Sequence, residues 1–132
     1  MADRICLDTN VLVDVLRNKT DSVDWLKAVE NKSIIATTYI NAFELYYGAF
    51  RSVAREVNMH AAETLLQRLM LLNFSKASAR HAGETFAKLQ REGNTVEIRD
   101  LFMASIATAE GFKLKTKNVK HFERIHGVVL EP

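Results

Sequence analysis

The chain has 132 residues, the size of one domain, and 48% of them are hydrophobic, which is enough to bury a core. One proline and five glycines leave no low-complexity linker, so we expect residues 1–132 to form a single domain. We find no apolar run that could cross a bilayer and no signal peptide, and the single Cys6 excludes an internal disulfide, which together favour a cytoplasmic protein. The net charge of +2 is compatible with a nucleic-acid partner but does not establish one.

The first predicted element is a short buried strand over residues 5–7, which runs directly into Asp8, Thr9 and Asn10. These three residue types favour helix N-caps, and apolar residues at helical spacing follow over 11–16. Ligands of open α/β sheets bind outside the carboxyl ends of the strands, so Asp8 stands where chemistry is expected. These residues alone fit a helix cap equally well.

The chain then alternates between helices and strands. The pattern predicts a helix over 21–31, a strand over 34–37 and a helix over 39–51, which is typical of a parallel sheet. Glu44 lies inside the last of these helices, and no residue one turn away from it is cationic. A carboxylate in such apolar surroundings belongs either to the rim of the core or to a site that supplies a cation.

The second half of the chain continues this alternation. We expect helices over 52–70, 76–92 and 101–110, and strands over 71–74, 112–116 and 128–130. The segment from Leu65 to Leu72 has more apolar residues than one buried helix face needs. They fit either a plain core or a partner surface, such as that of a homodimer. Asp100, at the start of a late helix, is either a cap or part of a site.

Three acids therefore stand on elements that can meet at one edge of a parallel sheet: Asp8, Glu44 and Asp100. Carboxylates at close range repel one another, and a divalent cation relieves that repulsion. Oxygen ligands without clustered His or Cys favour Mg²⁺ or Mn²⁺ over Zn²⁺. Such an ion can activate water and stabilise charge on a phosphate, so the hypothesis is metal-dependent phosphodiester hydrolysis.

Four segments resemble the PIN-domain ribonucleases, specifically the VapC-type toxins of type II (VapBC) toxin–antitoxin systems: residues 5–12, 41–48, 100–107 and 115–124. The resemblance covers essentially the whole chain. It implies a three-layer α/β/α fold whose central, mainly parallel sheet has about five short strands. It also implies an acidic Mg²⁺ or Mn²⁺ pocket, RNA as the substrate of a metal-activated water, a homodimer, and a small VapB-like antitoxin that covers the pocket.

Carried over residue by residue, the resemblance assigns catalysis and metal binding to Asp8, Glu44 and Asp100. Thr116 matches the hydroxyl residue near the pocket, and Asn10 would hold Asp8 or a water through its amide. The late basic residues are expected to contact the RNA backbone, chiefly Lys115, Lys117, Lys120 and Arg124, although a solvated basic edge is the alternative for each.

The chain departs from the fuller family pattern at two positions. Asn118 falls where many relatives have a fourth acid, and an amide oxygen can ligate a metal without adding negative charge. His121 also stands where an acid is common. Glu97, about one helical turn before Asp100, would substitute for the missing acid only if that segment is already helical.

Three alternatives stay open at this point. A catalytically weak PIN-fold module that binds RNA or protein agrees with the change at Asn118, and a housekeeping RNA-processing nuclease would use the same acids. Phosphoryl chemistry on an aspartate is the third alternative. It is disfavoured because Asp8-Thr9-Asn10 lacks the second acid of a DxD motif and Leu72-Asn73-Phe74 offers no acceptor.

Overall fold

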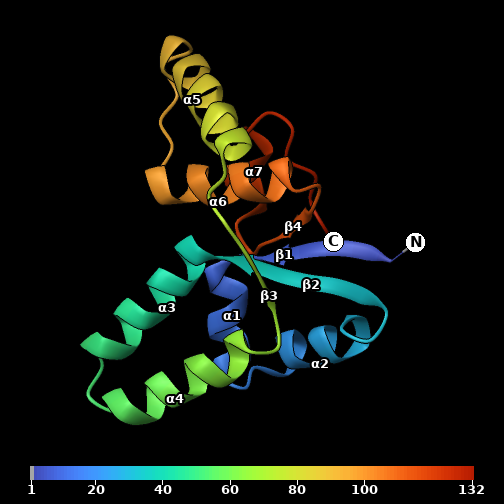
Figure 1. Cartoon of the computed structure of the whole chain (residues 1–132), viewed down its shortest axis with the longest axis vertical. Helices are drawn as coiled ribbons and strands as arrows, with labels where there is room; N and C mark the ends of the chain where they lie inside the picture. The colour runs from blue at the N-terminus through green and yellow to red at the C-terminus, as the bar shows by residue number, and fades with distance from the viewer. Residues whose placement is uncertain (1) are drawn as a thin grey trace.

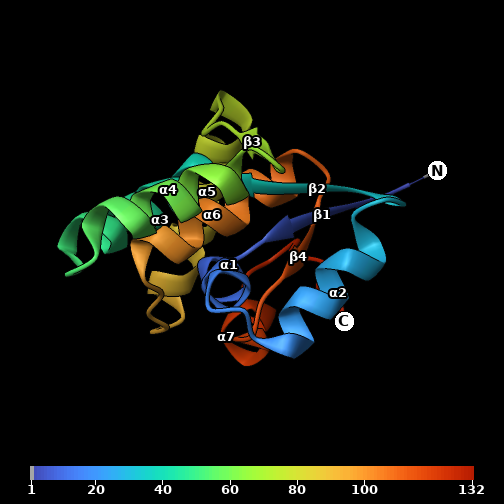
Figure 2. The ribbon, with the colours of Figure 1, turned by 90° about the horizontal axis from the view of Figure 1, so that it is seen from below.

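The computed structural model describes residues 2–132, and over this range it contains a four-stranded, fully parallel sheet. The strands are β1 (Asp3–Leu7), β2 (Ser33–Thr38), β3 (Met70–Leu72) and β4 (Lys113–Lys115). Their spatial order is β3-β2-β1-β4, which can be followed in Figure 2. In register, Ile5 of β1 stands opposite Ile35 of β2 on one side and Lys113 of β4 on the other.

Helices cover both faces of this sheet (Figure 1). They are α1 (Thr9–Leu16), α2 (Thr20–Val29), α3 (Tyr39–Arg51), α4 (Arg55–Leu66), α5 (Lys76–Arg91), α6 (Ile98–Ala109) and α7 (Val119–Glu123). Successive side chains of a strand point to opposite faces, so Ile5 and Leu7 enter a core formed with α1 to α4. Cys6 faces the other way, against α6. The result is the three-layer α/β/α fold that the sequence predicted.

Side-chain caps fix where several helices begin. The Asp8 side chain accepts a hydrogen bond from the Thr9 N–H at the start of α1. Thr38 and Asn41 form a reciprocal capping box at the start of α3, and both are fully buried. Because α1 and α3 both begin directly after a strand, their first turns lie at the carboxyl edge of the sheet.

The structure corrects two of the sequence-based expectations and decides between the two interpretations of a third feature. Residues 128–130 do not form a strand but a single bridge between Leu130 and Leu114, since β4 has only three residues to pair with. The helix expected over 52–70 is the shorter α4, because part of the apolar run that follows belongs to β3. Leu65, Leu66 and Leu72 are buried in the core of the chain itself, so the plain-core interpretation of that surplus is the correct one.

Within residues 2–132, none of the helices combines the length and the apolar character that a membrane crossing requires.

Candidate active site

Three acids from three separate elements line one open pocket of about 500 Å³ at the carboxyl edge of the sheet. Asp8 follows β1, Glu44 lies in the middle of α3, and Asp100 lies in the first turn of α6. They are 36 and 56 residues apart along the chain, from 8 to 44 and from 44 to 100. The fold therefore brings the trio that the sequence singled out to the lining of one pocket.

Asp8 is buried and is held at both oxygens. Oδ1 accepts from the Thr9 N–H at 2.7 Å, and Oδ2 accepts from the Thr116 hydroxyl at 2.7 Å. Burial raises the pKa of this carboxyl above its usual range, and the nearby charge of Glu44 raises it further, against the lowering effect of the two hydrogen bonds. The bonds fix the carboxylate in place but supply no full positive charge.

Glu44 is positioned by a short hydrogen-bond chain. Asn41 Nδ2 donates to Thr9 Oγ1 at 2.9 Å, and the Thr9 hydroxyl donates to Glu44 Oε1 at 2.7 Å. The other carboxylate oxygen lies 3.6 Å from Arg99 Nη1. This cation could not be predicted from the residues around Glu44, because Arg99 belongs to α6 and not to the helix that carries Glu44.

Asp100 is the most perturbed of the three acids. Its pKa is raised to about 6, first because the carboxyl is partly buried and next because Asp8 is close. His121 Nε2 lies 3.2 Å from Asp100 Oδ2 but outside hydrogen-bonding geometry. Arg124 Nη2 lies 3.1 Å from His121 Nδ1, and because a guanidinium only donates, Nδ1 accepts and Nε2 carries the ring proton.

Of the two supporting residues, Thr116 contacts Asp8 directly, whereas Asn10 bonds to the segment after β4 and not to Asp8. Besides donating to Asp8, Thr116 Oγ1 accepts the Asn118 N–H at 3.0 Å and lies 3.5 Å from Asn10 Nδ2. Asn10 Oδ1 accepts the Lys117 N–H at 3.3 Å. Asn118 is the N-cap of α7 and lines the pocket, so its amide stands where a fourth oxygen ligand would come from.

The remaining residues that the sequence suggested for the site lie partly inside and partly outside the pocket. Glu97 is the side-chain cap of α6: Oε2 accepts from the N–H groups of Arg99 and Asp100, and this use leaves it outside the pocket lining. Lys117 lines the pocket, whereas Arg124 braces α7 through the Thr95 carbonyl and Lys120 is exposed outside the pocket.

Sequence reasoning missed Asp14. It is buried on α1, accepts from Lys117 Nζ at 2.7 Å, and lies 3.7 Å from Lys19 Nζ. The signal was available, since an acid interrupts the apolar run between Val13 and Val15. The ion-pair partner of Asp14 is Lys117, which follows β4, so the sequence around Asp14 did not indicate it.

The donor chemistry of this pocket suits a hard divalent cation. Carboxylate and amide oxygens line it, and nearby acids raise the pKa of two of the carboxyls: Glu44 that of Asp8, and Asp8 that of Asp100. A bound cation would offset this repulsion. Across residues 2–132, no three His, Cys, Asp or Glu side chains are grouped tightly enough to hold an ion without adjustment. An ion here would therefore draw the three carboxylates together.

This fold and pocket define a class of protein. Residues 5–128 match the sequence profile of the PIN domain, and the chain belongs to the PIN-domain family.

Within that family, its relatives are VapC ribonucleases. The tRNA(fMet)-specific endonuclease VapC of Salmonella typhimurium is 33% identical over 128 residues, covering 97% of this chain and 96% of the relative. Ribonuclease VapC2 of Rickettsia felis is 34% identical over 126 residues, covering 95% and 94%. Among solved structures, a chain of VapBC2 from Rickettsia felis, bound to a DNA fragment from its promoter, superimposes with a TM-score of 0.91 at 31% identity, covering 96% of each chain.

Proposed function

We propose that this protein is a Mg²⁺- or Mn²⁺-dependent endoribonuclease that acts as the toxin of a VapBC-type pair. The observation that carries the proposal is the convergence of Asp8, Glu44 and Asp100 on one pocket, with the pKa of Asp8 and of Asp100 raised. Similarity to VapC ribonucleases over nearly the full chain supports the same activity.

Asp8, Glu44 and Asp100 would hold the ion, with the Asn118 amide as a further oxygen donor. A bound divalent ion would lower the pKa of a water and offset the charge on a phosphate. Thr116 and the Asn41–Thr9 pair hold two of the carboxylates in fixed orientation, which limits the reorganisation that ligation requires. Lys117 and Arg17 at the rim of the pocket would bind the RNA backbone.

A VapB-like antitoxin is the proposed protein partner, because similar structures are VapBC complexes. One face of α3, the loop after it and the start of α4 expose large apolar side chains: Phe43, Tyr47, Phe50, Val53 and Val57. The same helix α3 also carries Glu44 of the acidic pocket. Apolar patches of this kind mark partner surfaces. A segment lying on α3 at this patch would pass Glu44 and so cover the pocket.

Cleavage of RNA by the purified chain tests the nuclease. We expect fragments of total RNA in Mg²⁺ or Mn²⁺ and none in EDTA, and we expect Asp8→Ala to abolish cleavage while circular dichroism shows an unchanged fold. Cleavage by Asp8→Ala at the parent rate would refute the site. RNA binding without cleavage in either metal would favour the catalytically weak binding module instead.

Binding of the protein encoded next to this gene tests the partner surface. Tyr47→Asp places a charge in the patch and should weaken the complex at least tenfold, about 1.4 kcal/mol. Val129→Asp changes an equally exposed apolar residue outside the patch and serves as the control. Equal affinity of the two variants, measured by calorimetry, would remove α3 from the interface.

A further inference from the structure

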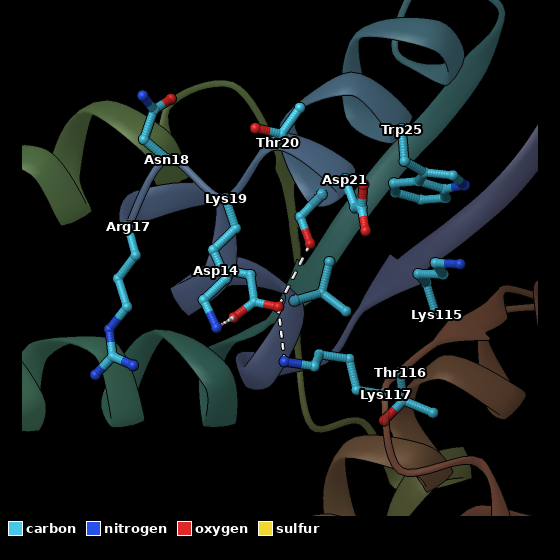
Figure 3. A pocket seen from close by; sticks show the side chains of 12 residues that line it. Asp14, Arg17, Asn18, Lys19, Thr20, Asp21, Trp25, Lys115, Thr116 and Lys117 are labelled. Atoms are coloured by element: carbon cyan, nitrogen blue, oxygen red, sulfur yellow. Dashed lines mark hydrogen bonds and ion pairs between the residues drawn. The ribbon is translucent and has the colours of Figure 1, made fainter.

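A second pocket, of about 780 Å³ and shown in Figure 3, shares part of its lining with the acidic pocket. It lies between α2, the loop that joins α1 to α2, and the residues that end and follow β4. Four residues line both pockets: Asp14, Arg17, Lys19 and Lys117. A polymer bound at the acidic site can therefore continue into this second pocket without leaving the surface.

The charge of this second pocket is opposite to that of the first. Among its lining residues are four cations, Arg17, Lys19, Lys115 and Lys117, against Asp14 and Asp21. Asp14 is already paired, as the dashed lines from Lys19 and Lys117 show in Figure 3. The remaining positive charge suits a phosphate of an RNA strand whose neighbouring phosphate lies at the acidic site.

Trp25 adds an aromatic surface to these cations. It is the only tryptophan in the sequence, it packs partly against the core, and its indole lies across the pocket from Arg17 in Figure 3. Lys115 Nζ lies 4.8 Å from the ring centroid, in a cation–π contact, and also donates to the Pro132 carbonyl. The ring face is thus covered by a long, half-exposed side chain and not by the core.

We propose that this pocket binds an unpaired nucleotide next to the cleaved bond, with its base stacked on Trp25 and its phosphate on Arg17 and Lys117. The base takes the place of the Lys115 ammonium over the ring, and the displaced ammonium becomes available to the phosphate. Aromatic stacking beside a cationic groove is how proteins bind single-stranded nucleic acid, and a base within a duplex cannot stack in this way. The subsite rests on the proposed ribonuclease function and adds to it a specific place for the nucleotide next to the cleaved bond.

Trp25 itself reports on this binding, because its fluorescence is the only indole signal. The wild-type chain is titrated in EDTA, which prevents cleavage, with a 12-nucleotide single-stranded RNA and with the same strand in a perfect duplex. Excitation at 295 nm and an N-acetyltryptophanamide control correct for absorption by RNA. We expect saturable quenching by the single strand and little by the duplex. Bound RNA, shown by anisotropy of an end label, without any change in Trp25 fluorescence would overturn the subsite.

Two pairs of variants separate stacking from packing and charge. Trp25→Leu should raise the KM for the 12-nucleotide RNA about tenfold with little change in kcat, whereas Trp25→Phe keeps an aromatic face and should stay within about threefold of wild type. Arg17→Gln should reduce the slope of log K against log salt by about 0.7, and Arg91→Gln on α5 should not. A Trp25→Leu protein with wild-type KM contradicts the proposal.

The outcomes also distinguish this subsite from the function on which it rests. Metal-dependent cleavage with an unquenched Trp25 overturns the subsite alone. A chain that neither binds nor cuts RNA overturns both. Quenching by the antitoxin and not by RNA assigns the pocket to the protein partner and also overturns the subsite.

Discussion

Asp8 and Asp14 stand at opposite ends of α1, and both are buried, with 6% and 7% of their surfaces exposed. Their pKa values nevertheless shift in opposite directions. The pKa of Asp14 is lowered, chiefly because Lys117 donates to it at 2.7 Å, whereas burial raises the pKa of Asp8. Neutral donors alone bind the Asp8 oxygens, and its charged neighbours include Glu44.

The difference shows that charge compensation, and not depth of burial, separates these two aspartates. Asp14 is a completed ion pair and has no need of a further cation. Asp8 instead belongs to a cluster of acids with Glu44 and Asp100, and the Arg99 guanidinium, 3.6 Å from Glu44, offsets only part of the charge of that cluster. Perturbed carboxylates of this kind are characteristic of functional sites.

The largest expected effect is on catalysis. Asp8→Asn keeps the shape of the side chain but removes its charge, and it should reduce RNA cleavage by about 10²–10³-fold or more. Asp14→Asn removes a charge buried to the same degree and should cost less than about tenfold. Initial rates on one fluorogenic RNA, at equal Mg²⁺, measure both. Equal losses would break the distinction between the two aspartates.

Stability against pH should separate the two kinds of aspartate. A carboxyl with a raised pKa binds its proton more tightly in the native state than in the unfolded state. Its ionisation therefore lowers the free energy of unfolding, and this loss is absent below about pH 3.8 and complete above about pH 6. A pKa shift of this size corresponds to about 3 kcal/mol. Solvent screening reduces this free energy, because the Asp100 side chain keeps 30% exposure. Asp100→Asn should therefore stabilise the metal-free protein by about 1–2 kcal/mol at pH 8 and hardly at pH 3.5.

Urea unfolding of both variants at a series of pH values measures these effects, and in it Asp14→Asn should show the opposite sign to Asp100→Asn. The lowered pKa of Asp14 contributes stability above its unfolded pKa and loses it as the pH falls, so this variant should be less stable than wild type at pH 8 and approach it in acid. Parallel pH profiles for Asp100→Asn and Asp14→Asn would contradict the assigned environments.

Magnesium should stabilise only a protein with an intact acid cluster. At a Mg²⁺ concentration ten times its Kd, the free energy of unfolding should rise by about 1.4 kcal/mol. Asp8→Asn should lose this increment and Asp14→Asn should keep it. NaCl at matched ionic strength controls for screening, and an equal increase in NaCl would mean that no specific site exists.

The smallest expected effect concerns the arginine beside Glu44. Arg99→Gln removes a cation that competes for this carboxylate, so the affinity for Mg²⁺ should rise about two- to fivefold, the range expected for an exposed ion pair. Arg91→Gln on α5 is the control for net charge. Isothermal titration measures both, and weaker Mg²⁺ binding by Arg99→Gln would show that Arg99 supports the site.

Local patterns in the sequence determined most of the architecture and the identity of the three acids. These patterns involve only a few neighbouring residues, so they can be recognised without knowing the fold. They are the apolar run that ends at Asp8, the capping residues before α3 and α5, and the alternation of strands and helices. Glu44 was conspicuous for the same reason, since its own helix offers it no cation.

Only the tertiary structure decided how these acids are compensated. Thr116 meets Asp8 across 108 residues and Lys117 meets Asp14 across 103, and Arg99 reaches Glu44 from another helix. Such pairs depend on the path of the chain, because parallel strands bring distant loops to one edge of the sheet. The sequence thus identified three carboxylates that line one pocket, and the packing of α1, α3, α6 and the segment after β4 decided which acids have a charged partner.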